Sequence, residues 1–375
     1  MKKIIHISTV HPRRDTRIFY RECVSLYKEG YDVTLIVADG LGEECFKGVN
    51  IIDLGKAKNR IANLFCGYFN ILKIIKKLKP ELVHFHDAEL MIVGKAIQKK
   101  GIPVFYDIHE NVAAQILDKK HLPSYLRKPL HHIYKIVEKL LINSFHLILA
   151  EDSYKNIYIS KGKSITVVLN LPEQQSFNQF INNNRVENGI FYIGGVSNVR
   201  GLDITIEALN ILKDRKINFF MYYVGAISQN NLLKLDLKKI ESNIKFYGRM
   251  DLIEGYALSK KCKVGLAVLK PIANYVESYP TKIFEYMSIK LPVITSNFPL
   301  YKNVVEKHET GYCIDPFSAE ELANKIQILL SDDNLVKKMG ENGIKAVSEK
   351  FNSNLEEVKL FNIYKEVLNT TDVNL

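Results

Sequence analysis

The sequence predicts an α/β protein with two doubly wound parallel sheets, one in each of two domains that face a cleft. Three observations predict this fold. Short β-like runs alternate with amphipathic helical patterns in the first half of the chain, a polar stretch interrupts them, and the same alternation then begins again. A chain of 375 residues is also too long for one small core and matches two domains of ordinary size.

The first domain is predicted over residues 1–170. Its predicted strands are 4–10, 33–38, 51–54, 82–86, 104–108, 145–150 and 165–169. Helical patterns lie between most of them, at 17–29, 61–79, 89–100 and within 126–142. Because parallel strands need long crossover connections, this order predicts a parallel, Rossmann-like sheet with helices on both faces.

The second half repeats this plan after a polar segment. Residues 171–188 contain Pro172, paired glutamines and three consecutive asparagines, so they are predicted to form an interdomain linker. The second domain is predicted over 189–353, and the tail 354–375 forms a helix that can return to the first domain. Its predicted strands are 190–193, 219–224, 244–247, 264–269, 293–295 and 312–314, with helices at 202–213 and 319–330.

Composition indicates a globular protein of a reducing compartment. Hydrophobic residues make up 47% and charged residues 25% of the chain, and the apolar runs are far shorter than the ~20 residues of a membrane-spanning helix. Residues 1–10 are interrupted by His6 and lack a small-residue cleavage site, so we interpret them as a buried strand. The five cysteines are scattered and never form C-x-x-C, which argues against disulfides and a cysteine zinc site and predicts a cytoplasmic protein.

The basic residues are concentrated in the first domain. The net charge is +11, and residues 1–170 hold 27 Lys and Arg against 17 Asp and Glu. Segments 56–79 and 119–139 combine this charge with apolar residues at helical spacing. Such helices either lie on an anionic membrane surface, where each cation adds ~1 kcal/mol, or present a solvated face over an ordinary core stripe. Nucleic acid is not an expected partner, because no recognition motif accompanies the charge.

The most informative segment is 277–285, ESYPTKIFE, which leads into the apolar run 291–296. Pro280 suits the first turn of a helix, whose free amides predict an anion pocket at the positive end of its dipole. A phosphate there would have Glu277 on one side and Glu285 one turn deeper, which fits a nucleotide-sugar. The alternative is an ordinary amphipathic helix with two solvated glutamates. The predicted amides belong to Ser278, Thr281, Lys282 and Ile283.

Glycine turns follow two predicted strands of the second domain. Gly194 and Gly195 permit close backbone approach to a ligand, and Arg200 near the next helix start can reach a diphosphate. These glycines also fit a plain tight turn, because they lack the full G-x-G-x-x-G spacing. The second glycine turn follows the predicted strand 244–247 and contains Gly248 and Arg249.

Polar residues also follow three predicted strands of the first domain. Because the carboxyl ends of parallel strands meet at one edge of a sheet, these residues predict a single acceptor site. Histidine beside a carboxylate also suggests a metal ion, but adjacent residues of a strand point to opposite faces, so no metal site is predicted. The three pairs are Asp15 and Arg17, His86 and Asp87, and His109 and Glu110.

Together these motifs resemble the retaining GT-B glycosyltransferases of family 4, and the resemblance covers nearly the whole chain. The match is strongest at Glu277-x7-Glu285 and the run 291–294. In the first domain, segments similar to a bacterial subgroup that builds surface polysaccharides are 15–19, 29–35, 84–87 and 106–110.

The resemblance implies a role for each candidate residue. Glu277 would bind the donor sugar near the reacting carbon, and Glu285 would bind the nucleotide ribose. Lys282, Arg200 and the intervening amides would hold the diphosphate of a UDP- or GDP-sugar, while His109 would line the donor-sugar and acceptor pocket. The residues implied for the acceptor are Asp15, Arg17, His86, Asp87 and Glu110.

The chain departs from a common family pattern at Gly195, where that pattern has an arginine after the first loop glycine. One of two usual cationic phosphate contacts is therefore missing. Because a helix N-terminus with Arg and Lys can still stabilise a leaving diphosphate, no metal or other cofactor is expected to be required. The expected reaction is a same-face substitution in which the departing phosphate helps to deprotonate the acceptor. The residues considered as replacements for the missing arginine are Arg13, Arg14, Arg249 and Lys282.

The sequence thus predicts a glycosyltransferase that moves a sugar from a nucleotide donor to a hydroxyl. The expected acceptor is a bacterial polysaccharide or lipid-linked glycan, as in capsule or lipopolysaccharide synthesis, presented at the cytoplasmic membrane face. Two alternatives stay open: a sugar-nucleotide epimerase or hydrolase of the same plan, and a catalytically silent sugar-nucleotide-binding subunit. The joint presence of Glu277, Glu285 and Lys282 argues against the silent subunit, whereas Gly195 keeps it open.

Overall fold

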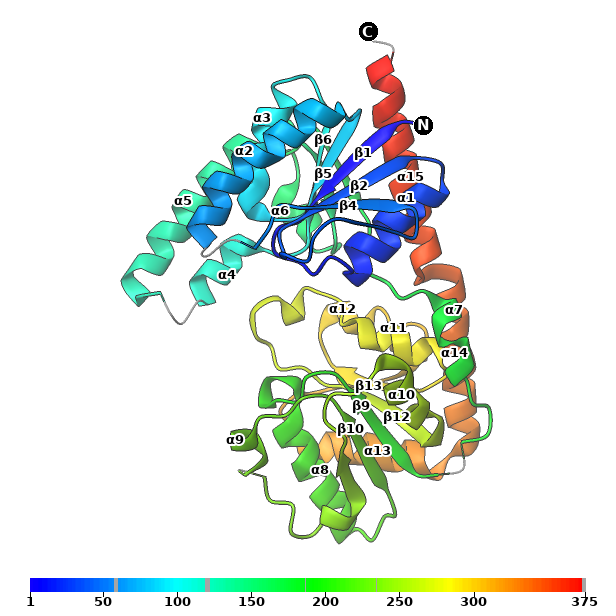
Figure 1. Cartoon of the computed structure of the whole chain (residues 1–375). Coiled ribbons are helices and arrows are strands. Elements are labelled where there is room, and N and C mark those ends of the chain that lie inside the picture. Colours follow the sequence, from blue (N-terminus) through cyan, green and yellow to red (C-terminus); the bar gives the residue numbers. More distant parts are fainter. Residues whose placement is uncertain (57–59, 119–121, 186, 234, 373–375) are drawn as a thin grey trace. The chain divides into compact units, whose positions relative to one another are not determined.

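The computed structural model describes residues 1–56, 60–118, 122–185, 187–233 and 235–372. The chain divides into two compact units (Figure 1). Unit 1 comprises Met1–Asn170 and Ser353–Leu375, and unit 2 comprises Leu171–Asn352. Each unit contains one large sheet with its own hydrophobic core.

Unit 1 contains an eight-stranded sheet in the order β3-β4-β2-β1-β5-β6-β7-β8, and all neighbours are parallel except β3 and β4. Its strands are β1 (Lys3–Ile7), β2 (Asp32–Val37), β3 (Glu44–Phe46), β4 (Val49–Asp53), β5 (Leu82–Phe85), β6 (Val104–Ile108), β7 (His146–Leu149) and β8 (Ser164–Val167). Its helices are α1 (Val24–Lys28), α2 (Arg60–Leu78), α3 (Met91–Gln98), α4 (Val112–Asp118), α5 (Ser124–Ile142), α6 (Tyr154–Tyr158) and α15 (Ser353–Asp372).

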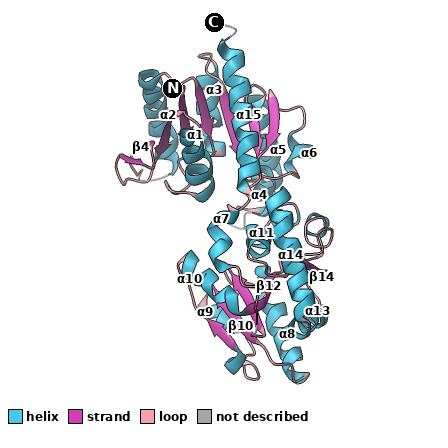
Figure 2. Cartoon of the chain, turned by 90° about the vertical axis from the view of Figure 1, so that its right-hand side faces the viewer, coloured by secondary structure: helices cyan, strands magenta, loops and turns pink. Residues whose placement is uncertain are grey.

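Helices cover both faces of this sheet. Ile75 of α2 and Met91 of α3 join the apolar cluster on one face. Leu26 of α1 and Tyr364 of α15 join the cluster on the other (Figure 2). Because both faces are covered, the central strands β1, β5 and β6 are buried except for Lys3 at the start of β1, and they do not alternate between buried and exposed residues.

Unit 2 contains a six-stranded, fully parallel sheet in the order β11-β10-β9-β12-β13-β14. Its strands are β9 (Gly189–Ile193), β10 (Phe220–Val224), β11 (Ile244–Phe246), β12 (Cys262–Ala267), β13 (Val293–Ser296) and β14 (Gly311–Ile314). Its helices are α7 (Gln174–Phe177), α8 (Leu202–Asp214), α9 (Gln229–Leu232), α10 (Leu252–Ala257), α11 (Thr281–Ser288), α12 (Pro299–Lys302), α13 (Ala319–Ser331) and α14 (Asp333–Lys350).

The predicted fold class is confirmed, since two Rossmann-like sheets are present. Several elements of unit 1 differ from the sequence predictions, and helices α4 and α6 were not predicted. Strand β3 was not predicted, because three residues are too few to show an alternating pattern. The helix predicted over 17–29 begins as the π-helix Thr16–Cys23 and becomes α-helical only at Val24. Such π-helical segments occur frequently at functional sites.

The segment predicted as a linker, 171–188, packs onto unit 2 instead. Phe177 and Phe180 lie against Tyr256, with ring centroids 5.1 and 5.7 Å away. Their spacing of three residues brings both rings to the same side of a helical turn. The segment is polar in overall composition, but its two phenylalanines attach it to unit 2.

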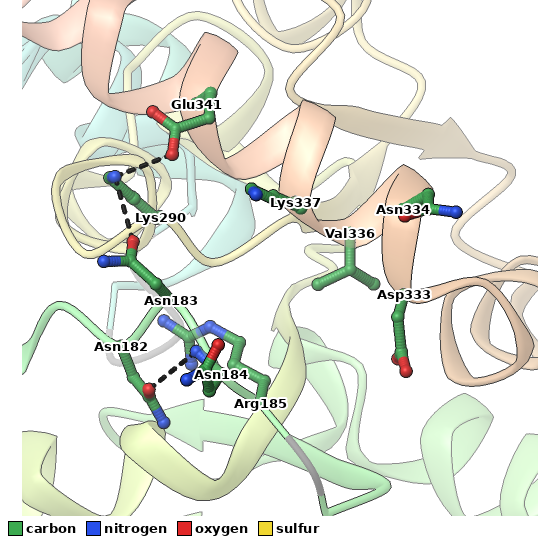
Figure 3. A pocket seen from close by; sticks show the side chains of 10 residues that line it. All are labelled: Asn182, Asn183, Asn184, Arg185, Lys290, Asp333, Asn334, Val336, Lys337 and Glu341. Carbon is green, nitrogen blue, oxygen red and sulfur yellow. Dashed lines mark hydrogen bonds and ion pairs between the residues drawn. The ribbon is translucent and has the colours of Figure 1, made fainter.

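Arg185 fastens the end of this segment to unit 2 (Figure 3). Its buried guanidinium donates three hydrogen bonds of 2.6–2.7 Å to backbone carbonyls. Nearby, Lys290 donates to Asn183 and Glu341 beside a pocket of about 380 Å³. The carbonyls that accept from Arg185 belong to Ser259, Cys262 and Ile289.

Candidate active site

A cavity of about 400 Å³ lies in unit 2, where β9 and β12 end and α11 begins. Open parallel sheets bind ligands at this edge, beyond the carboxyl ends of their strands. The cavity therefore has the location expected of a ligand site. The predicted donor residues that line it are Gly194, Arg200, Ser278, Thr281, Lys282 and Glu285.

Three residues predicted to bind the donor do not line this cavity: Gly195, Arg249 and Glu277. Arg249 is exposed and follows β11, an edge strand that is separated from β9 by β10. Its neighbour Gly248 accepts a hydrogen bond of 2.7 Å from Gly225, which packs on Gly194, so the contact of Arg249 with the diphosphate stays a prediction. Glu277 is exposed as well, although its neighbour Ser278 lines the cavity.

The turn after β9 requires glycine because another loop crosses it closely. Gly194 has φ +127° and its amide donates to Val224 O at 2.8 Å. Gly225, with φ +143°, packs so tightly that an added Cβ would lie 1.8 Å from Gly194 O. Neither position tolerates a side chain at low cost. This packing keeps the floor of the cavity free of side chains.

Lys282 directs an unpartnered ammonium toward this glycine turn. Its Nζ is shielded from solvent, has no hydrogen-bond partner among the described residues, and lies 4.0 Å from the ring centroid of Tyr192. A Cβ added to Gly194 would be 3.2 Å from Nζ. Burial, with a contribution from the Arg200 charge, lowers the pKa of Lys282 from 10.5 to about 7. A buried ammonium in this state gains strongly from an anionic ligand.

Arg200 occupies the space that Gly195 leaves open. A Cβ added at Gly195 would lie 3.1 Å from one terminal nitrogen of Arg200, whose Nε donates to Tyr275 Oη at 3.4 Å. The cavity thus holds two cations, Arg200 and Lys282, although position 195 has no side chain. Arg13 and Arg14 were also considered as replacements for the arginine missing at position 195. Both form ion pairs with carboxylates of unit 1 instead.

The start of α11 differs in detail from the prediction. Pro280 has an extended conformation and directly precedes the helix, rather than lying in its first turn. The amide of Ile283 donates to Pro280 O at 3.0 Å, which removes it from the predicted anion pocket. Thr281 and Lys282, the first two residues of the helix, line the cavity. The N-terminus of α11 therefore faces a ligand with fewer amides than the sequence suggests.

Glu285 lies one turn deeper along α11, in the wall of the same cavity. One of its carboxylate oxygens accepts a hydrogen bond from the hydroxyl of Tyr256, which holds it in place. Its other oxygen remains available to a polyhydroxylated ligand. Glu285 and Lys282 therefore line the same cavity, one turn apart on α11.

In unit 1, three side chains converge where β5 and β6 end. Asp107 Oδ2 lies 2.9 Å from His109 Nε2 and 3.3 Å from His86 Nδ1. Burial alone would raise the pKa of Asp107, but the Arg17 charge and the histidine hydrogen bonds hold it well below its usual value. The carboxylate therefore stays ionised and orients His109, whose side chain is 16% exposed.

Sequence reasoning missed Asp107, although a signal was present. Asp107 on β6 and His109, which directly follows the strand, are two positions apart, a spacing that places side chains on the same face of an extended chain. The structure also corrects the acceptor assignment of Arg17, whose buried guanidinium binds both oxygens of Asp107 at 2.9 Å and donates to Val168 O at 2.7 Å. Arg17 supports the position of Asp107 from the interior instead of facing a ligand.

The other predicted acceptor residues have local partners. Asp15 accepts from the amides of Arg17 and Ile18 and caps the π-helix. Asp87 is buried and accepts from the amide and hydroxyl of Thr9 after β1. Both carboxylates therefore shape the loops rather than project from them. Glu110 is exposed and accepts from Gln115.

Helix α5 carries an outward apolar surface on unit 1. Ile133, Ile136 and Leu140 are 57–65% exposed and lie on one side of the helix, with Lys135 and Lys139 beside them. Within the described ranges of the chain, no helix has the length and hydropathy needed to cross a bilayer. Part of the other basic segment, 56–79, lies outside the described residues, at 57–59.

Two family models match this chain. The model described as "Glycosyl transferases group 1" matches residues 173–346, and "Glycosyltransferase Family 4" matches residues 16–154. The first match contains the cavity of unit 2. The second contains the cluster around Asp107.

Individual relatives are distant. The capsular polysaccharide biosynthesis glycosyltransferase CapM of Staphylococcus aureus is 22% identical over 53% of this chain and 50% of its own length. A Campylobacter jejuni α-1,4-N-acetyl-D-galactosaminyltransferase, whose name specifies an undecaprenol-diphosphate-linked glycan, is 20% identical over 76% of this chain and 74% of its own length. The alignments with CapM and the next two curated relatives span only 36–50% of those proteins.

Solved structures share the fold. Anabaena HepE, crystallised in complex with UDP, superposes with a TM-score of 0.73 at 16% identity and covers 98% of this chain and 100% of its own. At this identity the similarity establishes the two-sheet architecture alone.

Proposed function

On the premise that this chain belongs to the family 4, group 1 glycosyltransferases, which are retaining enzymes of GT-B fold, we propose that it transfers a sugar from a nucleotide-sugar to a hydroxyl. The observation that carries this proposal is the shielded, unpartnered ammonium of Lys282 beside Arg200 and the glycine turn. Two cations, a bare backbone turn and a helix N-terminus together suit a diphosphate.

Each cavity residue has a proposed task. The diphosphate lies against Lys282, Arg200 and the Gly194 turn, where its charge is stabilised as the glycosidic bond breaks. Glu285 binds the hydroxyls of the nucleotide ribose, and Glu277, at the rim beside Ser278, binds the donor sugar. The UDP complex of the distant HepE supports a UDP-sugar as the first donor to try, with GDP-sugars next. These cations supply charge stabilisation at the leaving group without a metal ion.

His109 is the proposed contact of unit 1 with the reacting sugars. Asp107 and Arg17 hold its ring from the interior while one side of the ring stays accessible. Neutral imidazole can donate to or accept from a hydroxyl. Departure of the phosphate on the same face as acceptor attack then gives retention, with the phosphate helping to deprotonate the acceptor.

The acceptor is proposed to be a bacterial surface polysaccharide or lipid-linked glycan, met at the cytoplasmic membrane face. The named activities of CapM and the Campylobacter relative support this class. Incubating the chain with nucleotide-sugars and lipid-linked glycans tests it, with product configuration read by NMR. Sugar release or epimerisation without an acceptor would instead support the hydrolase or epimerase alternative. A nucleotide-sugar at 100 times its Kd should add ~2.7 kcal/mol of stability, which identifies the donor for these assays.

We expect Glu285→Ala to weaken nucleotide binding roughly 10- to 100-fold, because hydrogen bonds to a charged group are worth ~1.5–3 kcal/mol. Calorimetric titration with the nucleoside diphosphate measures the change. Glu254→Ala, at an exposed carboxylate of α10, is the matched control and should bind normally. Equal affinity in both variants would remove Glu285 from the proposed site.

The exposed face of α5 is proposed to rest on anionic lipid. Its apolar stripe would enter the interface while Lys135 and Lys139 meet the phosphate groups. Each fully buried apolar side chain contributes ~1.5–3 kcal/mol, so Ile136→Glu with Leu140→Glu should weaken vesicle binding at least about tenfold. Cosedimentation with phosphatidylglycerol vesicles at low salt measures this.

Ile159→Glu provides the control for that experiment. Ile159 is 68% exposed and lies after α6, away from the α5 stripe. This variant should sediment with vesicles like the parent chain. If the parent itself stays in the supernatant at low salt, the membrane part of the proposal is wrong, whereas the transferase part is unaffected.

A further inference from the structure

Three histidines and one glutamate form a buried cluster in unit 1. His6 lies on β1, Glu22 on the π-helix, and His84 is on β5, which His86 directly follows. Their exposed fractions are between 0 and 3%. Imidazole and carboxylate are ligands that zinc and similar transition metals prefer.

The four side chains point at a common centre. Glu22 Oε2 lies 3.9 Å from His6 Nδ1, 3.9 Å from His84 Nδ1 and 3.8 Å from His86 Nε2. His6 Nδ1 and His86 Nε2 are 3.0 Å apart. Metal–ligand distances of ~2.0–2.2 Å place the ligand atoms of a tetrahedral site ~3.3 Å apart. The observed separations between ligand atoms, 3.0–3.9 Å, therefore lie on both sides of the value expected for a four-coordinate ion.

The carboxylate of Glu22 has no hydrogen bond in this environment. Among the residues that the structure describes, neither of its oxygens has a hydrogen-bond partner. Arg17 Nε lies 3.2 Å from Oε1 and balances charge on one side only. A buried carboxylate without hydrogen bonds is costly, and coordination to a cation removes that cost.

We propose that His6, Glu22, His84 and His86 bind one divalent transition-metal ion of the zinc class. The ligands come from three separate segments and leave no direction open to solvent, so the site is structural rather than catalytic. The Tyr364 hydroxyl of α15 lies 2.7 Å from His84 Nδ1 and 3.1 Å from His6 Nε2, so it contacts two of the four proposed ligands. Through these histidines, the site connects helix α15 to strands β1 and β5 of unit 1.

The ion also connects to the candidate active site through His86. Ligation at His86 Nε2 leaves the ring hydrogen on Nδ1, which faces Asp107 Oδ2 at 3.3 Å. That hydrogen bond steadies the carboxylate that orients His109. The neighbouring set of His86, Asp107 and His109 is a weaker choice for the ion, because Arg17 already binds both oxygens of Asp107.

Metal analysis of the full chain tests this proposal. Protein purified without metal-affinity resin or chelator should contain one equivalent of zinc by mass spectrometry. After removal with a strong chelator, Tm should fall and recover with Zn²⁺, and Co²⁺ should produce the intense visible bands of a tetrahedral site. Metal-free parent protein that gains neither stability nor these bands from added Zn²⁺ and Co²⁺ would overturn the proposal.

Two variants test whether the proposed side chains bind the metal ion. Glu22→Gln keeps the shape of the side chain and should lower metal affinity about tenfold or more. The control is His146→Gln on β7, a buried histidine outside the cluster, which should keep the full equivalent of metal. Undiminished metal affinity in Glu22→Gln would contradict the assignment. Should Glu22→Gln not fold, the cobalt spectrum of the parent chain decides the question.

Discussion

Replacing Lys282 with methionine should lower kcat/KM for the nucleotide-sugar by about 100-fold or more, the cost of removing one preorganised contact to developing charge. Lys282 is the residue whose ammonium is shielded and unpartnered in the cavity of unit 2. Methionine keeps the apolar stem and its packing against Tyr192 but removes the charge. Steady-state kinetics and nucleotide titration measure the loss. Lys302→Met, at an exposed lysine of α12, should behave like the parent.

The pH dependence distinguishes this role from a structural one. Because the pKa of Lys282 is about 7 without ligand, the ammonium loses its proton as pH rises above neutrality. A bound diphosphate raises that pKa, so binding takes up a proton above pH 7. Donor affinity should therefore fall with increasing pH, by up to about tenfold per unit. Lys282→Arg stays charged and should flatten the profile, and a parent profile that is already flat would contradict this assignment.

Asp107→Asn should lower the free energy of unfolding by about 3–5 kcal/mol, because it removes one partner from a buried ion pair. Arg17 would keep its charge in the interior, and His109 would lose the carboxylate that orients it. We expect a corresponding loss of transferase activity below the unfolding transition. Urea denaturation measures the stability, and kinetics at low urea measure the activity.

The double variant Arg17→Met with Asp107→Leu separates the two effects. It removes both charges of this pair together, so part of the stability should return, limited by the loss of the Arg17 charge beside Glu22, whereas the activity should not return. Near-normal stability in Asp107→Asn alone would show that the pair is not the buried anchor described above. Recovery of activity in the double variant would exclude Asp107 as the residue that positions His109.

Most of the fold was predicted from local patterns of apolar and polar residues in the sequence. Alternation of short apolar runs with amphipathic helices identifies a parallel sheet because each parallel connection needs its own helix. The segment 277–285 was likewise informative, since a proline before a helix start, a lysine and two glutamates lie close together in sequence. In the structure, Lys282 and Glu285 of this segment line one cavity.

Predictions that depended on side-chain direction were less successful. Arg17 and Asp87 follow strands at the correct sheet edge, yet both turn inward and bind other parts of unit 1. Arg249 sits in a glycine turn after the edge strand β11 and does not line the cavity of unit 2. Position along the chain does not specify whether a polar side chain faces a ligand or compensates a buried charge.

The sequence by itself determined the two-sheet architecture and pointed to the segment 277–285, four of whose predicted residues line one cavity, because these depend on periodicity and on residues within a few positions of one another. Only the tertiary structure decided that Arg200 fills the space above Gly195, and that Asp107 links Arg17 to His109. It alone brought His6, Glu22 and His84 around one centre. The contacts of His6 with His86 and of Arg17 with Asp107 join residues 80 and 90 positions apart, and their geometry follows from strand order and packing rather than from any local pattern.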